Sequence, residues 1–423
     1  MFADDRIIYH IDVNSAFLSW EAVYRLKHLG GRLDLRTIPS AVGGDPQMRH
    51  GIILAKSIPA KKFNIHTGES TMAARQKCPD IVLVPPNYTL YQQCSKAFMD
   101  ILREYTPTVE QYSIDEAFMD MSGTEKLWGE PVEIANQIRE RIYNELGFTV
   151  NIGVSNNKLL AKMASDFKKP NLVHSLFPCE IQKKMWPLPV EDLFFVGRAS
   201  SKKLKNLGVN TIGDLANTDI GILKAHFKSY GEVIHALANG IDTSDVLSTP
   251  PEQKGYGNST TTPYDIVEIM DAKKTLLALS ETVGARLRKD NMEAAVISVG
   301  VKDWEFHSVS HQMALDNPTN ITEEIFESAC KLLEEFWDGI PLRHLGIHTS
   351  KVTPANAYRQ ANLFESKDYQ KLQRLNQTLD AVRKRFGNDS IFRAAFLTGR
   401  IDHMSGGISR ERRNVDYSQL EIK

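Results

Sequence analysis

The sequence predicts an α+β protein with several domains. The chain has 423 residues, more than one hydrophobic core usually organises, so two to four domains are expected. A hydrophobic content of 42% and a charged content of 24% are typical of a folded globular protein. Expected elements follow in the order strand, helix, hairpin, helix, strand. This order indicates a mostly antiparallel sheet with helices on one face.

The first expected strand spans residues 7–13 and carries one carboxylate, Asp12, near its end. A helix follows to about Leu26. Residues 108–121 contain two short strands on either side of Asp115 and Glu116. Because neighbours in a regular strand face opposite ways, these two carboxylates can share a site only if the chain turns or bulges there.

A third strand is predicted at residues 149–154, followed by a helix that Ser155 or Asn156 caps and that Pro170 stops. Its apolar residues recur every four positions. The rest divides into an inserted unit, a helical zone, a linker, a second α/β unit and a polar tail with helical periodicity at residues 369–386. The linker contains Pro250 and Pro251.

The bulk chemistry excludes several classes of protein. The four cysteines are scattered without a C-x-x-C pair, which argues against a zinc site or a disulfide framework. The N-terminus does not have the pattern of a signal peptide, and no apolar stretch reaches ~18 residues. We therefore expect a cytoplasmic protein that is not associated with a membrane.

The formal net charge is −1, so a nucleic-acid partner requires a local basic patch. Residues 153–206 hold ten Lys and Arg against four Asp and Glu, whereas residues 259–353 hold nine against fifteen. The basic run is either a DNA-contacting surface or a solvated helix face, and composition does not decide between them.

The carboxylates Asp12, Asp115 and Glu116 are the main candidates for chemistry. Nucleotidyl transfer needs hard oxygen ligands for two Mg²⁺ ions about 3.5–4 Å apart. The alternative is that Asp12 is a turn residue and that the other two lie in a solvated hairpin loop.

The residues around these carboxylates resemble the paired metal motifs of the Y-family DNA polymerases. The resemblance covers roughly residues 5–355, in the family's order and spacing. It rests on DVNSAF at 12–17, PAKKF at 59–63, YQQ at 91–93, SIDEAF at 113–118, GVSNNK at 153–158 and AKMASDFKKPN at 161–171.

The resemblance implies a right-hand-like polymerase with a palm, fingers, a helical thumb containing a helix-hairpin-helix, and an α/β little finger. The implied division is palm 1–16 and 87–172, fingers 17–86, thumb 173–240, linker 241–257, little finger 258–355 and tail 356–423. The implied activity is template-directed, low-fidelity extension of a primer 3′-hydroxyl with dNTPs, past damaged template bases and without proofreading.

The resemblance also assigns roles to individual residues. Asp12, Asp115, Glu116 and the carbonyl of Val13 would hold two Mg²⁺ ions. Phe17 occupies the steric-gate position, where an aromatic ring collides with a ribose 2′-hydroxyl. The remaining dNTP contacts would come from Ser15, Ala16, Lys61 and Lys169. Lys61 stands where arginine is more common, which predicts looser triphosphate binding.

Two further segments predict partners of a monomeric polymerase. Residues 193–215 resemble a helix-hairpin-helix that binds the DNA backbone through Gly197, Lys202, Lys203 and Lys205. Phe195 replaces the usual first glycine of the turn, which we expect to weaken it. The segment Gln360 to Phe364 resembles the Q-x-x-L-F peptide that docks on a sliding clamp through Gln360, Leu363 and Phe364.

Two other functions are compatible with part of this pattern. A metal-dependent nuclease or nucleotide cyclase could use the same carboxylates, but Phe17, Lys61, Lys169 and the hairpin favour a polymerase. A catalytically silent clamp-binding scaffold is disfavoured because all three carboxylates are present.

Overall fold

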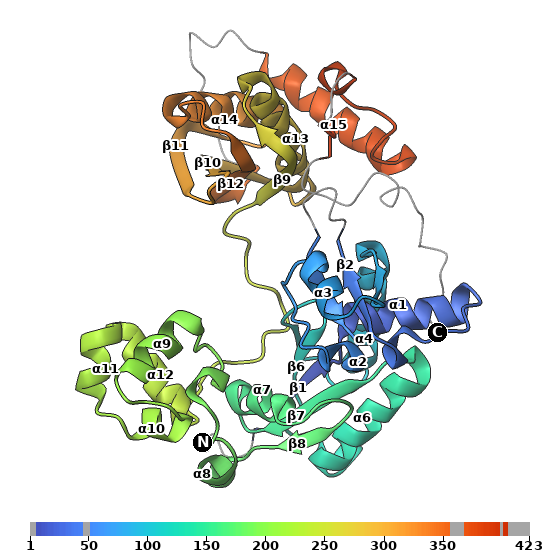
Figure 1. The fold of residues 1–423 in the computed structure, drawn as a ribbon, viewed down its shortest axis with the longest axis vertical. Coiled ribbons are helices and arrows are strands. Elements are labelled where there is room, and N and C mark those ends of the chain that lie inside the picture. The colour runs from blue at the N-terminus through green and yellow to red at the C-terminus, as the bar shows by residue number, and fades with distance from the viewer. Residues whose placement is uncertain (1–5, 45–50, 356–367, 398–400, 405–423) are drawn as a thin grey trace.

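The computed structural model describes residues 6–44, 51–355, 368–397 and 401–404. This part of the chain contains three separate β-sheets with associated helices and one all-helical unit (Figure 1). The predicted α+β class with several domains is therefore confirmed. Within the described residues, no helix is long and apolar enough to cross a bilayer.

The first sheet has five strands in the order β5-β6-β1-β7-β8. All its neighbouring pairs are antiparallel except β7 with β8, which is parallel. The central strand is β1, and each of its six residues is buried. The strands are β1 Ile8–Val13, β5 Val109–Gln111, β6 Glu116–Asp120, β7 Val150–Ser155 and β8 Val173–Ser175.

Helices cover both faces of this sheet. On one face, Tyr9, Ile11 and Val13 of β1 pack into a core with side chains of α1, α4 and α6. The helices that contact this sheet are α1 Ala16–His28, α4 Tyr88–Arg103, α6 Pro131–Leu146 and α7 Lys158–Asp166, and the short α5 Glu125–Trp128 precedes α6.

The opposite face is covered by α7, so the expectation of helices on one face is wrong. Gly153 of β7 explains the difference, because a Cβ there would lie 1.9 Å from the carbonyl oxygen of Ala161. The missing side chain lets α7 approach the strand closely. Asn157 caps α7, one or two residues after the expected Ser155 or Asn156, and its side-chain oxygen accepts a hydrogen bond from the Leu160 amide.

A second, three-stranded sheet lies next to α1. In it β2 pairs with β3 antiparallel and with β4 parallel. Leu18 and Ala22 of α1 pack on this unit, while Trp20 and Val23 of the same helix pack on the first sheet. The elements are η2 Leu35–Thr37, β2 Ser40–Gly43, β3 Ile53–Lys56, α2 Ile58–Lys61, α3 Thr71–Lys77 and β4 Val82–Val84. Therefore α1 joins the two units.

The third unit is helical and shares its core with α7. Leu159, Leu160 and Met163 of α7 pack among the apolar side chains of this unit. Its elements are η4 Pro178–Glu180, α8 Ile181–Lys184, η5 Val190–Asp192, α9 Arg198–Asn206, α10 Ile212–Asn217, α11 Ile220–Phe227 and α12 Ser229–Ala238. This shared core fixes the position of the helical unit beside the first sheet.

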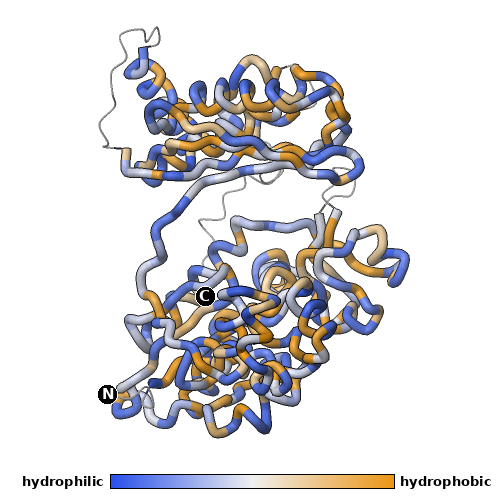
Figure 2. Tube along the Cα trace, turned by 90° about the vertical axis from the view of Figure 1, so that its left-hand side faces the viewer, coloured by the Kyte–Doolittle hydropathy of each residue, from blue (hydrophilic) through white to orange (hydrophobic). Residues whose placement is uncertain are grey.

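Residues 241–256 cross without helix or strand to the fourth unit (Figure 1). Its antiparallel sheet has the order β11-β10-β12-β9, with helices on the side away from the rest of the molecule (Figure 2). The elements are β9 Gly257–Ile266, α13 Ile269–Lys289, β10 Met292–Asp303, β11 Ser308–Thr319, α14 Thr322–Phe336 and β12 Leu342–Pro354.

The helix predicted at residues 369–386 is confirmed as α15 Tyr369–Phe386. It is attached to α13 and α14 of the fourth unit (Figure 1). The buried Glu281 of α13 accepts hydrogen bonds from Arg383 and Arg393, and Arg288 pairs with Asp380. A last short element, η6 Ala394–Phe396, follows α15.

Candidate active site

Strand pairing brings Asp12 and Glu116 together. The two residues are direct partners in the antiparallel register of β1 and β6, so their side chains share one face of the sheet. This is the face that α7 covers, and Asp12 is buried there. The pairing unites two carboxylates that are about a hundred residues apart in the sequence.

Asp115 lies in the turn between β5 and β6. The amides of Tyr112 and Ser113 both donate to the Glu116 carbonyl, which closes the turn. The Ser113 hydroxyl donates to the Asp115 carboxylate at 2.7 Å, and the Val13 amide donates to the Asp115 carbonyl at 3.0 Å. The expected turn at these adjacent carboxylates is confirmed, and the last bond holds the Val13 backbone beside Asp115.

Two lysines reach the paired carboxylates from α7 and the loop after it. Lys169 forms an ion pair with Asp12 and a second one with Asp166 at 2.8 Å. Lys162 donates to Glu116 at 2.9 Å. Lys169 was expected near the triphosphate, and here its ammonium lies at the metal-type carboxylate Asp12. No role for Lys162 could be assigned from the sequence.

The two paired carboxylates have opposite protonation tendencies. Burial raises the pKa of Asp12 to about 6, and Lys169 only partly offsets this effect. Burial also acts to raise the pKa of Glu116, but the nearby His10 and Lys162 outweigh it and lower that pKa to about 2. Burial lowers the pKa of His10 to about 4, so this ring is neutral at pH 7.

The carboxylates fit a divalent hard cation. Asp12 and Glu116 are adjacent on one sheet face, Asp115 is in the neighbouring turn, and oxygen donors are what Mg²⁺ prefers. A buried carboxylate whose pKa is raised is electrostatically under-compensated, and a nearby cation would favour its ionised form. The donor set therefore suits magnesium.

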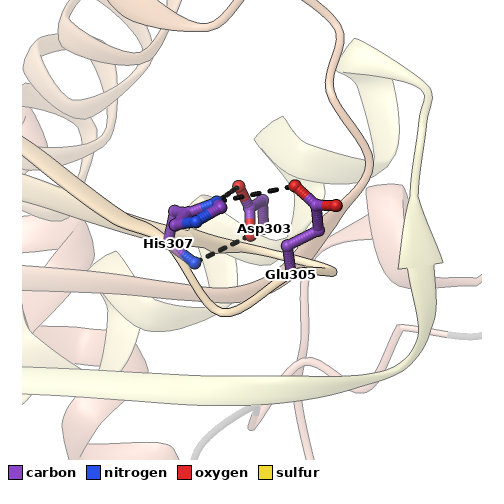
Figure 3. A group of neighbouring side chains, drawn as sticks. All are labelled: Asp303, Glu305 and His307. Atoms are coloured by element: carbon purple, nitrogen blue, oxygen red, sulfur yellow. Dashed lines mark hydrogen bonds and ion pairs between the residues drawn. The ribbon is translucent and has the colours of Figure 1, made fainter.

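A second cluster of side chains in the described part of the chain has atoms of the kind that bind metals. Asp303, Glu305 and His307 place one such atom each within 4.8 Å of one another at the tip of the β10–β11 hairpin (Figure 3). The amide and ring of His307 both bond to Asp303, at 2.9 and 3.1 Å. Hydrogen bonding within the tight hairpin explains this cluster.

Phe17 lies in an aromatic cluster at the start of α1. Its ring stacks on Tyr91 with 4.5 Å between centroids and an interplanar angle of 9°, and it also contacts Trp20 and Tyr88. Phe17 is only partly buried, whereas Trp20 and Tyr91 are fully buried. The buried rings of Trp20 and Tyr91 thus hold the Phe17 ring in place, while part of Phe17 remains accessible to solvent.

The turn from β1 to α1 has a left-handed residue. Ser15 has φ 49° and ψ 51°, a conformation that is uncommon for residues other than glycine and that is enriched at functional sites. The amide of Asn14 is bound by the Thr149 carbonyl, and Ala16 is buried. These contacts fix the backbone of Ser15 and Ala16 in the turn that leads from Asp12 to Phe17.

Lys61 ends the short helix α2 and is exposed. Lys56 on β3, which no sequence motif indicates, is close enough to be affected by the charge of Lys61. Burial, followed by repulsion from Lys61, lowers the pKa of Lys56. Two cations therefore lie together in the small unit.

The helical unit contains the expected hairpin. Phe195 adopts φ 76°, the left-handed conformation that favours glycine, and its ring is 59% exposed. The Tyr230 hydroxyl donates to the Phe195 carbonyl at 2.5 Å, which supports the turn from behind. The expected glycine-like turn is present although the residue is Phe.

An open groove of about 630 Å³ lies beside this turn, and α9 begins at its edge with Gly197 as cap. Lys205 forms an ion pair with Glu191 at 2.6 Å, and Lys203 lies over the Phe227 ring. The groove is lined by Glu191, Val196, Gly197, Arg198, Ser201, Lys202, Lys205 and Asn206. The predicted phosphate-binding residues except Lys203 thus line one groove. The predicted clamp residues Gln360, Leu363 and Phe364 lie outside the described residues.

Comparisons with known proteins agree with this architecture. Residues 11–166 match the impB/mucB/samB family, residues 253–363 match the C-terminal domain of that family, and residues 178–209 match the family's HHH motif. The DNA polymerase IV of Clostridium acetobutylicum is 46% identical over 393 residues, which are 93% of this chain and 98% of the relative. The chain belongs to the Y-family DNA polymerases.

Other relatives of this polymerase are similar along nearly the whole chain. DNA polymerase IV of Acetivibrio thermocellus is 39% identical, over 93% of this chain and 98% of the relative. DNA polymerase IV 2 of Bacillus subtilis is 36% identical, over 93% and 95%.

A solved chimeric Y-family DNA polymerase has the same fold, with a TM-score of 0.70 and 22% identity over 82% of this chain and 99% of that one. The polymerase therefore has the right-hand-like architecture of its family. We use the family's domain names for the units described above and call the first sheet with its helices the palm, the three-stranded unit the fingers, the helical unit the thumb and the fourth unit the little finger. The enzyme is a DNA-directed DNA polymerase.

Proposed function

We propose that this polymerase extends a primer 3′-hydroxyl with dNTPs by two-metal nucleotidyl transfer at Asp12, Asp115 and Glu116. The observation that carries the proposal is the register of β1 with β6, which pairs Asp12 with Glu116 beside the turn that holds Asp115. The Val13 carbonyl is proposed as a further ligand. Two bound Mg²⁺ ions would activate the attacking 3′-oxygen and stabilise the leaving pyrophosphate.

The side chains around the carboxylates have separate tasks in this proposal. Lys169 is close enough to Asp12 to contact a triphosphate bound at the same carboxylates, where a cation offsets the charge of the leaving group. Lys61 contributes a second cation from the fingers. Phe17, held by Tyr91, blocks the space of a 2′-hydroxyl, and the Ser15 and Ala16 backbone lines the sugar and phosphate site.

We further propose that the enzyme copies past damaged template bases and does not proofread. The small fingers support bypass, because α2 has four residues and α3 has seven, so little protein can enclose the nascent base pair. The chain matches relatives named DNA polymerase IV, and the matches cover nearly the whole length of those relatives. The described residues form the four units named above, with α15 attached to the fourth, and contain no further separate domain that could be an exonuclease.

The proposed partners are primer–template DNA, dNTPs and a sliding clamp. The thumb groove supplies phosphate contacts through Gly197 and Lys202. The peptide from Gln360 to Phe364 would tether a monomeric, cytoplasmic enzyme beside the primer and raise its effective concentration there.

Primer extension by the purified protein with Mg²⁺, on matched undamaged and lesion-containing templates, tests this function. Extension on both templates, without shortening of a mismatched primer, is the expected result. Shortened strands would support the nuclease alternative, and cyclic nucleotides would support the cyclase alternative. A protein that makes no product but stimulates assembly on the clamp would support the scaffold alternative.

A further inference from the structure

Helix α7 carries two lysines one turn apart that each pair with a palm carboxylate. Lys158 binds both oxygens of Glu110 on β5, at 2.8 and 2.7 Å. Lys162 binds one oxygen of Glu116 on β6 at 2.9 Å. The side chains of Lys158 and Lys162 are only 12% and 10% exposed. Each ammonium also lies over an aromatic ring, that of Phe118 or Phe194.

The two carboxylates differ in their surroundings. Glu110 is paired in register with Phe118 and accepts the Leu247 amide, so it belongs to the packing of the interdomain segment. Glu116 is paired with Asp12. The other carboxylate oxygen of Glu116 lies 3.6 Å from Nε2 of His10, which is longer than a normal hydrogen bond. Lys162 therefore makes the shortest polar side-chain contact of the Glu116 carboxylate among the described residues, and His10 makes a longer and weaker one.

Helix α7, which carries Lys162, is held in place by several contacts. Gly153 lets α7 sit against β7, Asn157 caps the helix, and the neighbouring Leu159 and Met163 are in the thumb core. A hydrogen bond from a lysine on this helix favours the orientation of the Glu116 carboxylate that the structure shows. Groups that orient metal-binding side chains in this way commonly change metal affinity or activity about 10–100-fold when removed.

We propose that Lys162 is a positioning residue for the polymerase reaction, which fixes the Glu116 carboxylate in the orientation that binds the catalytic metal. This inference rests on the proposed function of Glu116. It gives Lys162 a role different from that of Lys169, which lies at Asp12 and is proposed to contact the triphosphate. Lys158 lies on the same helix, is similarly buried and also pairs with a glutamate, but its partner Glu110 is not a proposed metal ligand.

Charge and orientation predict opposite effects when Lys162 is neutralised. Loss of a positive charge beside Glu116 would by itself tighten binding of a divalent cation. Loss of orientation would weaken it. The sign of the change in metal affinity therefore separates the two contributions.

The test compares Lys162→Met with Lys158→Met in the full chain. Mn²⁺ binding is measured by titration without nucleotide, and the Mg²⁺ concentration for half-maximal single-turnover insertion is measured with primer–template DNA. We expect Lys162→Met to weaken Mn²⁺ binding and raise the Mg²⁺ requirement about tenfold or more, with unchanged DNA affinity. Lys158→Met should leave both values within about twofold of the wild type.

Lys162→Arg should restore most of the metal affinity, because a guanidinium can donate to the same carboxylate. If Lys162→Met does not fold, Lys162→Gln is used, since its shorter side chain does not reach Glu116 and the same weakening is expected. Unchanged or tighter Mn²⁺ binding in the neutral variant would overturn the proposal. A wild-type protein that does not extend primers would refute the proposed function instead, while the Mn²⁺ titration would still test the positioning role.

Discussion

Each carboxylate of the palm is held by contacts that arise from a different part of the fold. Asp12 is buried by β1 and paired with Lys169, Glu116 is paired with Lys162, and Asp115 is fixed by Ser113. The pKa of Asp12 is raised while that of Glu116 is lowered. Neighbouring carboxylates in different environments can serve different roles at one pH.

Phe17 provides a test of substrate selection at the residue scale. Phe17→Ala removes the ring that stacks on Tyr91 but leaves the carboxylates in place. We expect ribonucleotide insertion to rise relative to deoxynucleotide insertion by about 100-fold or more, equivalent to about 2.7 kcal/mol of discrimination. Single-nucleotide insertion kinetics with matched dNTP and rNTP measure the ratio.

Phe17→Tyr is the matched control, because it keeps the ring and should keep the selectivity. An unchanged ratio in Phe17→Ala would assign Phe17 to the aromatic core alone. A fall in melting temperature with that unchanged ratio would support the same conclusion.

At the scale of elements, α7 connects chemistry to DNA binding. One side of it closes the palm sheet over Asp12 and Glu116, and the other side shares a core with the thumb. The hairpin of the thumb borders that core, and Phe194 next to its turn lies under the ammonium of Lys162. Its lysines are not equivalent, because Lys205 is paired with Glu191, whereas the sequence predicted the same DNA-contacting role for Lys202, Lys203 and Lys205.

This difference predicts unequal contributions to DNA affinity. The double variant Lys202→Gln with Lys203→Gln should reduce the slope of log K against log salt by about 2, since each lost phosphate contact changes the slope by about 0.9. Lys205→Gln should change it by less, because Glu191 already compensates that charge. Fluorescence anisotropy on several duplex sequences over a range of salt measures the slopes. Weakening confined to one sequence, or the largest effect in Lys205→Gln, would contradict the assignment.

The attachment of α15 to the little finger can also be tested. Glu281→Ala leaves Arg383 and Arg393 without their buried partner, a loss that typically costs about 3–5 kcal/mol. We expect α15 to become susceptible to proteolysis and to hydrogen exchange, while extension of a short primer persists. Glu232→Ala is the control, because its ion pair with Lys224 is exposed and contributes about 1 kcal/mol or less. Equal protection of α15 in both variants would show that other contacts hold it.

The extent of prediction from sequence differs between these elements. The periodicity of residues 369–386 predicted α15 with the observed bounds, because helix formation depends on local pattern. Its docking on Glu281 could not be predicted, since the partners are about a hundred residues apart. Four of the five strands of the palm were predicted, but β8 was not. The face that α7 covers was also not predicted, because it depends on the single residue Gly153.

The candidate site was predictable to a similar degree. Asp12, Asp115 and Glu116 stood out at strand ends, and the need for a turn at Asp115 followed from strand geometry. The pairing of Asp12 with Glu116 required the register of two distant strands. Lys162 gave no signal, because a lysine on an amphipathic helix is usually a solvated residue.

At the scale of the whole molecule, the palm, fingers and thumb share cores through α1 and α7, whereas residues 241–256 lead to the little finger. The little finger carries its own sheet and helices, and α15 extends it beyond the end of the family's C-terminal match at residue 363. The proposed catalytic carboxylates therefore lie in the unit that shares cores with both the fingers and the thumb.

The most discriminating experiment measures single-turnover insertion of a correct dNTP by the wild type and by Asp115→Ala, with DNA affinity measured in parallel. We predict that Asp115→Ala loses insertion by about 1,000-fold or more, equivalent to about 4 kcal/mol, because the metal site is incomplete. DNA affinity should stay within about twofold, since the carboxylate binds metal and not duplex. Insertion by Asp115→Ala at the wild-type rate would contradict the assignment of the active site.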